Sequence, residues 1–105
     1  MLTERQQQLY EEFYSSTHEN EFLDRKTEVL VGLAAAIALN CNPCTRYYLR
    51  KAKETELSEG EIKEVVAKVM AVSAGQKKLQ FQESKLALER EQKNHEQTGG
   101  GRDSR

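Results

Sequence analysis

Apolar side chains recur at three- and four-residue spacing through most of this chain, which is the period of an α-helix with one buried face. The pattern predicts an all-α fold, a bundle of about five helices over residues 3–16, 25–39, 44–53, 59–74 and 76–96. We expect residues 1–97 to form a single helical domain and residues 98–105 to be a disordered tail.

Local signals mark the ends of some of these helices. Thr3 with Gln6, and Ser58 with Glu61, have the spacing of capping boxes, in which each residue's side chain bonds the other's backbone N–H group. Gly75 is interpreted as the C-terminal stop of the fourth helix, because glycine readily adopts the conformation that ends helices. The predicted boundary between the fourth and fifth helices rests on this glycine.

The helix over residues 25–39 is expected to be the most buried. Asp24 is a suitable N-cap, and the residues that follow it are apolar on nearly every side. Gly32, near the middle, permits the close approach of another helix. The last helix differs, because its apolar residues form a weak stripe that better suits a partner subunit: Leu79, Phe81, Leu86 and Leu88.

Composition narrows the classes of function. A chain of 105 residues has a thin core, so we expect it to assemble with further copies of itself. Its 16 basic and 17 acidic residues are interspersed, which indicates neither a nucleic-acid nor a membrane partner. The N-terminus has charges where a secretory signal needs apolar residues, and the longest apolar run is too short to span a bilayer. A cytoplasmic protein is expected.

Two cysteines, Cys41 and Cys44, carry the candidate chemistry. They lie at the break between two predicted helices, and Pro43 suits the first turn of the second one. A helix N-terminus lowers the pKa of a thiol, and an offset of three residues lets the sulfurs pair, so a redox dithiol without a cofactor is favoured. Two alternatives stay open: a zinc or iron site shared with the thiolates of a neighbouring subunit in a non-catalytic oligomer, and two inert buried cysteines.

Four motifs follow one another between about residues 20 and 80. They are L-D-R-K-T at 23–27, the Ala-rich apolar helix leading into C-N-P-C at 41–44, Tyr47 with Arg50, and E-I-K-E-V at 61–65. Together they resemble the carboxymuconolactone decarboxylase and alkylhydroperoxidase D-like (AhpD-like) family. The resemblance implies an all-helical fold, assembly into trimers, hexamers or larger rings, and, for the redox branch, peroxidase or disulfide reductase activity. It also implies that Cys44 attacks the substrate and Cys41 resolves, an order that the residues alone leave open.

Two positions depart from the redox branch. It has a histidine four residues after the second cysteine, where this chain has Tyr48, and a glutamate twelve residues before the first, where this chain has Val29. Glu28 is one step away, but one step along a helix is a rotation of about 100°, so Glu28 need not face the sulfurs. Tyrosine is a poor base at neutral pH, which disfavours efficient peroxide reduction and affects thiol–disulfide exchange less.

The predicted function is therefore that of a disulfide reductase with weak peroxidase activity. Its substrate is expected to be a protein or small-molecule disulfide, and its electron donor a protein dithiol or a small thiol. Both histidines, His18 and His95, are expected on solvated surface, because neither has a ligand partner nearby in the sequence. The predicted site comprises Cys41, Cys44, Tyr48 and Glu28.

Overall fold

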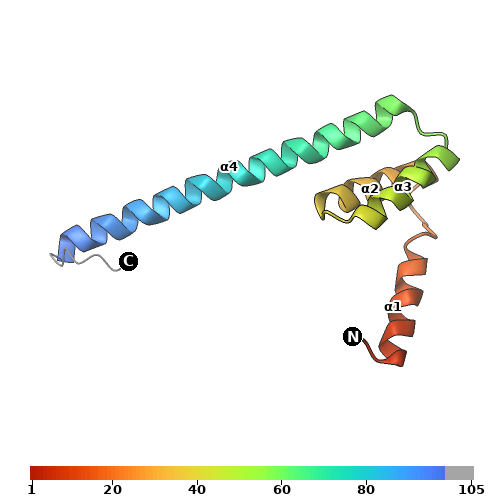
Figure 1. Ribbon diagram of the computed structural model, residues 1–105, viewed down its shortest axis with the longest axis horizontal. Helices are drawn as coiled ribbons and strands as arrows, with labels where there is room; N and C mark the ends of the chain where they lie inside the picture. The colour runs from red at the N-terminus through yellow and green to blue at the C-terminus, as the bar shows by residue number, and fades with distance from the viewer. Residues whose placement is uncertain (99–105) are drawn as a thin grey trace. The chain divides into compact units, whose positions relative to one another are not determined.

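The computed structural model describes residues 1–98, with side chains described through residue 95. All regular structure in this range is helical, in four helices: α1 (Glu4–Ser16), α2 (Arg25–Ala38), α3 (Asn42–Glu54) and α4 (Glu59–Thr98), drawn in Figure 1. The all-α fold is thus confirmed. The chain divides into two compact units, Met1–Val69 and Met70–Arg105, each of which is described by itself. Apart from Thr98, the predicted tail lies outside the described residues.

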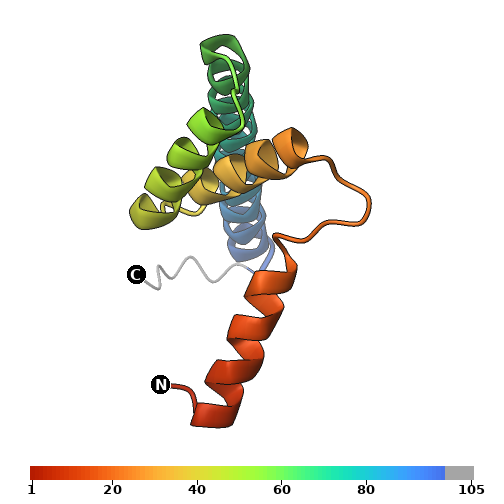
Figure 2. The same cartoon turned by 90° about the vertical axis from the view of Figure 1, so that its right-hand side faces the viewer.

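Helices α2 and α3 form an antiparallel hairpin, whose two arms lie side by side in Figures 1 and 2. Asp24 caps α2 as predicted, by accepting a hydrogen bond from a backbone N–H group in the first turn. Side chains of α2 supply most of the core. The buried apolar residues among those described are Val29, Leu33 and Ala36 from α2, and Ala52 from α3. The prediction that residues 25–39 hold the most buried helix is confirmed.

Both predicted capping boxes are present. The Thr3 hydroxyl accepts the Gln6 backbone N–H at 3.1 Å, and the Gln6 side chain accepts the Thr3 N–H at the same distance. At the start of α4, the Glu61 carboxylate accepts the Ser58 N–H at 2.8 Å, and the Ser58 hydroxyl accepts the Glu61 N–H at 3.1 Å. These bonds satisfy backbone donors that a helix cannot satisfy itself, and so fix where α1 and α4 begin.

The predicted stop at Gly75 is wrong, since α4 runs through it without interruption. A glycine inside a helix costs only about 1 kcal/mol relative to alanine. The residues around Gly75 include Ala74, Gln76, Lys77 and Lys78, which favour the helix and outweigh that cost. The predicted fourth and fifth helices are therefore one, and the described residues hold four helices rather than about five.

In the second unit, α4 carries large apolar side chains that contact little else. Phe81 is 68% exposed and Leu79 is 58% exposed, although apolar side chains of this size gain stability when they leave water. Separately, no helix in the described part of the chain is both long and apolar enough to cross a membrane.

Candidate functional site

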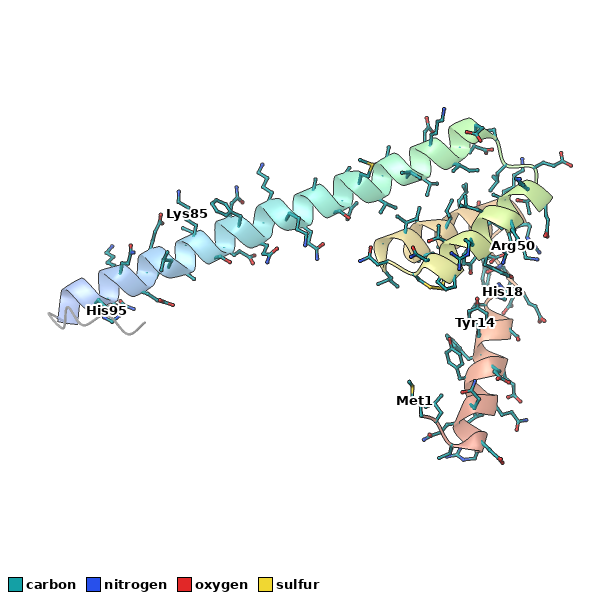
Figure 3. The ribbon with its side chains drawn as sticks, viewed as in Figure 1. Met1, Tyr14, His18, Arg50, Lys85 and His95 are labelled. Atoms are coloured by element: carbon teal, nitrogen blue, oxygen red, sulfur yellow. A yellow bond between two sulfur atoms is a disulfide. The ribbon has the colours of Figure 1, made fainter. Side chains whose placement is uncertain are left out.

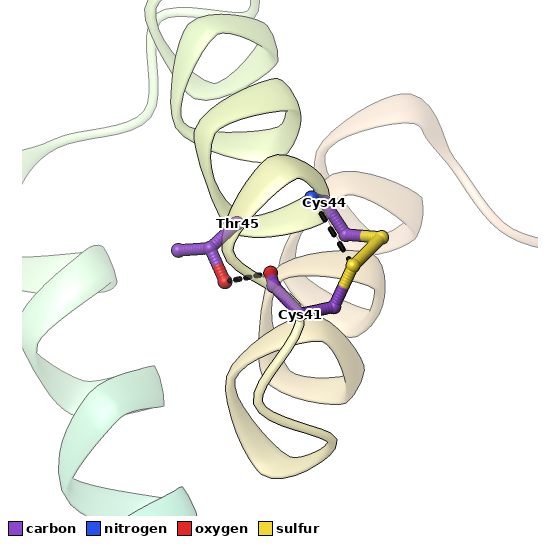
Figure 4. Close-up of a disulfide and its surroundings, with 3 residues drawn as sticks. All are labelled: Cys41, Cys44 and Thr45. Atoms are coloured by element: carbon purple, nitrogen blue, oxygen red, sulfur yellow. Dashed lines mark hydrogen bonds between the residues drawn. A yellow bond between two sulfur atoms is a disulfide. The ribbon is translucent and has the colours of Figure 1, made fainter.

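The two cysteines lie at the first turn of α3, where they form a disulfide (Figure 4). Asn40, with a positive φ of 58°, reverses the chain after α2, and the Cys41 N–H then donates to the Ala36 carbonyl at 2.9 Å. Pro43 occupies the first turn of α3, as predicted, although the helix begins at Asn42 rather than at Cys44. The turn thus fixes both sulfurs at the N-terminus of α3.

Hydrogen bonds hold Cys41 in the N-cap position of α3. Its sulfur accepts the Cys44 backbone N–H at 3.3 Å, and its carbonyl accepts the Thr45 hydroxyl at 2.9 Å, as dashed in Figure 4. A sulfur in this position faces the positive end of the helix dipole, so negative charge on Cys41 is stabilised there. Both cysteines are half-buried.

Tyr48 follows Cys44 by one turn of α3, and its ring lies against Gly32 of α2. A methyl group added at Gly32 would lie 2.8 Å from the Tyr48 Cδ1 atom and closer still to two other ring atoms. The prediction that Gly32 permits a close helix approach is therefore confirmed. Burial, followed by interactions with Tyr14, Glu28 and Tyr47, raises the pKa of Tyr48 above its ordinary value. The Tyr48 hydroxyl stays protonated at neutral pH.

Glu28 is the buried charged residue of the hairpin, with 10% of its side chain exposed. One carboxylate oxygen lies 3.4 Å from the His18 Nδ1 atom, and the other lies 4.0 Å from the Arg25 Nε atom. Its charge also acts on Tyr48, one of the causes of the raised Tyr48 pKa. Glu28 therefore belongs to the interior near Tyr48, while Val29, at the family's glutamate position, is core.

His18 is not a solvated residue, contrary to the prediction. Its side chain is only 25% exposed, and its ring packs edge-on against Tyr14, with the centroids 4.8 Å apart. The His18 ring is also tilted by 46° against the Tyr47 ring, with the centroids 5.9 Å apart. Figure 3 shows Tyr14 and His18 next to each other at the end of α1. The missed signal is the four-residue spacing of Tyr14 and His18, which meet although His18 lies in the turn that follows α1.

The structure thus brings the predicted residues together in two groups. Cys41 and Cys44 form the disulfide, whereas Glu28 and Tyr48 belong to a cluster completed by His18, Tyr14 and Tyr47, which we call the His18 cluster. Tyr48 and Cys44 lie on the same side of α3, because residues four apart share a helix face. Tyr47 and Tyr48 thus follow Cys44 by about one turn of α3.

Metal ligation by one chain finds little support in the described residues. They include no group of three or more His, Cys, Asp or Glu side chains able to hold a metal ion. The disulfide pair offers two thiolates when reduced, whereas zinc is almost always held by four ligands in structural sites. Within the described residues, Cys41 and Cys44 therefore belong to no group of three such ligands.

Comparisons with known proteins give one family and one fold. The model of the carboxymuconolactone decarboxylase family matches residues 6–81, a range that includes both cysteines and the His18 cluster. A crystal structure of a protein from Methanobacterium thermoautotrophicum is similar, with a TM-score of 0.67 and 24% identity. The similarity covers 71% of this chain and 84% of that one, and it shows the fold alone. No curated protein matches the chain.

Proposed function

Because the chain belongs to the carboxymuconolactone decarboxylase family, we propose that it acts in that family's redox branch, as a thiol–disulfide oxidoreductase that reduces disulfides. The observation that carries the proposal is the disulfide of Cys41 and Cys44, half-buried on the first turn of α3. Helix N-termini stabilise thiolates, and thiolates are the nucleophiles of disulfide exchange. The substrate is a protein or small-molecule disulfide.

The proposed reaction begins with the reduced dithiol. The Cys44 thiolate attacks one sulfur of the substrate, the substrate's S–S bond breaks, and the departing thiolate takes a proton. The Cys41 thiolate then attacks the Cys44 sulfur, which releases the second substrate thiol and leaves the Cys41–Cys44 disulfide. A protein dithiol or a small thiol returns two electrons and two protons. Such a cycle suits a compartment that keeps dithiols reduced, such as the cytoplasm.

The order of the cysteines in this cycle, with Cys44 attacking and Cys41 resolving, is the one that the redox branch of the family implies. When a reductant attacks the Cys44 sulfur, Cys41 departs as a thiolate, and the Cys44 backbone N–H that donates to the Cys41 sulfur stabilises this leaving group. Because the same contact also favours Cys41 as a nucleophile, the order needs an experiment of its own.

The first experiment measures the reduction potential of the Cys41–Cys44 couple in defined thiol–disulfide buffers. We expect a value of roughly −180 to −280 mV, the range of dithiols that exchange. A value well below about −300 mV would indicate an inert bond and overturn the proposal. Thiols that never pair, together with about one zinc or iron ion per two chains, would instead support the shared metal site.

Trapping tests the order of the cysteines. The Cys41→Ser variant should accumulate a mixed disulfide with its substrate on Cys44, because the resolving thiol is gone. The matched Cys44→Ser variant should accumulate none. Peptide mapping by mass spectrometry distinguishes the two, and a stable adduct on Cys41 of the Cys44→Ser variant would reverse the assignment.

We also propose that the protein is a homo-oligomer, a trimer or hexamer. Along α4, Val72, Leu79 and Leu86 recur every seven residues, and Ala74, Phe81 and Leu88 do the same. The two rows are two residues apart, about 200° around the helix, so they lie on nearly opposite faces. Apolar seven-residue repeats are typical of helices that pack along one another. A helix with two such rows can pack against two other helices at once, one on each row, and both would come from other copies of the chain.

A further inference from the structure

Helix α1 has an apolar stripe that the rest of the described chain leaves open to solvent. None of its side chains is buried, and Phe13 is 66% exposed. The large residues of the stripe lie within about 140° around the helix: Leu9, Tyr10, Phe13 and Tyr14. Because an amphipathic helix draws most of its stability from packing such a stripe, α1 needs a partner surface.

Acidic side chains flank the stripe on both sides. Around the helix, Glu12 lies about 60° before Leu9, and Glu11 lies about 60° after Tyr14. With Glu4 and Arg5, α1 has three acidic side chains and one basic side chain. An acidic helix is repelled by anionic lipid and attracted by a cationic surface, so the partner surface should be apolar and basic.

A groove of about 390 Å³ in the first unit has this composition. It lies where the end of α3 meets the start of α4, and its volume is typical of pockets that bind ligands, about 300–1,000 Å³. The residues that line it are Leu49, Arg50 and Lys53 of α3, Leu57 of the connection, and Glu59 and Ile62 of α4. Within the described residues, neither Arg50 nor Lys53 forms an ion pair. The groove therefore has apolar surface beside two unpaired cations.

The groove and the anchor of α1 lie on different faces of α3. The C-terminal end of α1 is joined to the hairpin through His18, whose ring contacts both Tyr14 and Tyr47. Leu49 comes two residues after Tyr47, which is about 200° around the helix, so Leu49 faces away from His18. Because α1 is anchored on the side of Tyr47, the groove of the same chain is out of its reach. A helix in the groove must therefore come from another copy.

We propose that α1 of a second copy of this chain docks in the groove. Leu9 and Phe13 enter it, since a helix in a groove inserts apolar side chains four residues apart. The acidic flanks of α1 then face Arg50 and Lys53, and opposite charges of this kind fix the register of an interface. The interface uses neither the cysteines nor the apolar rows of α4, so it is separate from the redox cycle and adds a second contact between copies.

Photochemical crosslinking tests which surface α1 meets. The Phe13→p-benzoylphenylalanine variant is mixed with wild-type protein labelled with heavy isotopes, left to exchange subunits and irradiated. A crosslink from the light peptide to a heavy peptide then joins two different chains. We expect mass spectrometry to find heavy crosslinked peptides from residues 49–62. If no heavy peptide from this range is found, or if heavy crosslinks fall only elsewhere, the inference is overturned.

Charge reversal tests the complementarity. In the heavy chain, Arg50→Glu with Lys53→Glu should lower the yield of these crosslinks about tenfold or more, because like charges then face each other. Adding Glu11→Lys with Glu12→Lys to the light chain should restore the yield, since the charges are opposite again. A loss that this second reversal does not restore would overturn the proposed pairing.

The matched control is Arg90→Glu with Lys93→Glu, which changes the same residue types at the same spacing in α4. Neither residue lines the groove, so the crosslink yield should stay unchanged. Equal losses in the control and the groove variant would overturn the inference. If the groove variant does not fold, the crosslinks to the wild-type chain decide. The reduction potential of the cysteines is measured separately, so the redox proposal and this interface can fail independently.

Discussion

The Tyr48 ring of α3 lies directly against Gly32 of α2. Replacing Gly32 with alanine drives a methyl group into the Tyr48 ring, and overpacking of this kind costs about 1–3 kcal/mol. We therefore expect Gly32→Ala to lower the free energy of unfolding by that amount, measured by urea denaturation.

Gly75 is the matched control for this substitution. It also lies inside a helix, but a methyl group there meets nothing within 4 Å. Gly75→Ala should therefore raise the free energy of unfolding by about 0.5–1 kcal/mol, because alanine is the better helix former. Equal effects of the two alanines would mean that the Tyr48 contact does not govern the packing.

Tyr48 also allows a test of why peroxide reduction is expected to be weak. Tyr48→His places an imidazole one turn after Cys44, and general acid–base catalysis contributes about 100-fold or more to rates. The imidazole is smaller than the phenol ring and fits the space beside Gly32. Peroxide consumption should rise accordingly in Tyr48→His and not in Tyr48→Phe. Equal rates in the two variants would contradict the view that a base is what the cysteines lack.

At the residue scale, the sequence identified the cysteines but not the whole cluster. Cys41, Pro43 and Cys44 are recognisable because their chemistry depends on neighbours in the same turn. His18 was missed because its partner, Glu28, is ten residues away and comes near only when the chain folds back after α1. Local spacing carries no direct information about such contacts.

At the scale of the element, the helix caps predict a response to acid. Bonds to backbone N–H groups hold the pKa values of Asp24 and Glu61 below their ordinary values, through Thr27 and Ser58 respectively. Their stabilising effect is therefore complete well above pH 4 and is lost as the pH falls through the lowered pKa values. We expect helicity, followed by far-ultraviolet circular dichroism, to fall in that range.

The Asp24→Asn variant separates capping from charge. Asparagine is about as good an N-cap as aspartate but does not titrate. The variant should keep its helicity at neutral pH and lose part of the acid response. Coincident acid curves for Asp24→Asn and the wild type would show that the Asp24 cap does not contribute.

The helices themselves were largely predictable, and the exception is informative. Capping boxes at Thr3 and Ser58 act within one turn, so the sequence contains all of their chemistry. Gly75 was misread because a glycine ends a helix only when the following chain turns away. Whether the helix ends at Gly75 or continues depends on the helix-forming tendency of the next twenty residues, not on the glycine.

At the scale of the whole molecule, the exposed apolar rows of α4 predict an interface. Burying a phenylalanine side chain contributes about 1.5–3 kcal/mol, so Phe81→Ser should weaken self-association about 10- to 100-fold. Sedimentation velocity measures the effect, and Gln82→Ser, at the next residue, is the control. A monomeric wild type at all concentrations would contradict the proposed assembly.

The small number of buried apolar side chains among the described residues affects how the stability of the protein depends on its concentration. Val29, Leu33, Ala36 and Ala52 form an apolar core too small to be expected to sustain a domain of this length. If copies of the chain complete that core, folding and association become one equilibrium governed by mass action. The melting temperature then rises with protein concentration, and dilution alone shifts the population toward the unfolded chain. In a cell, the amount of folded protein would depend steeply on how much of it is made.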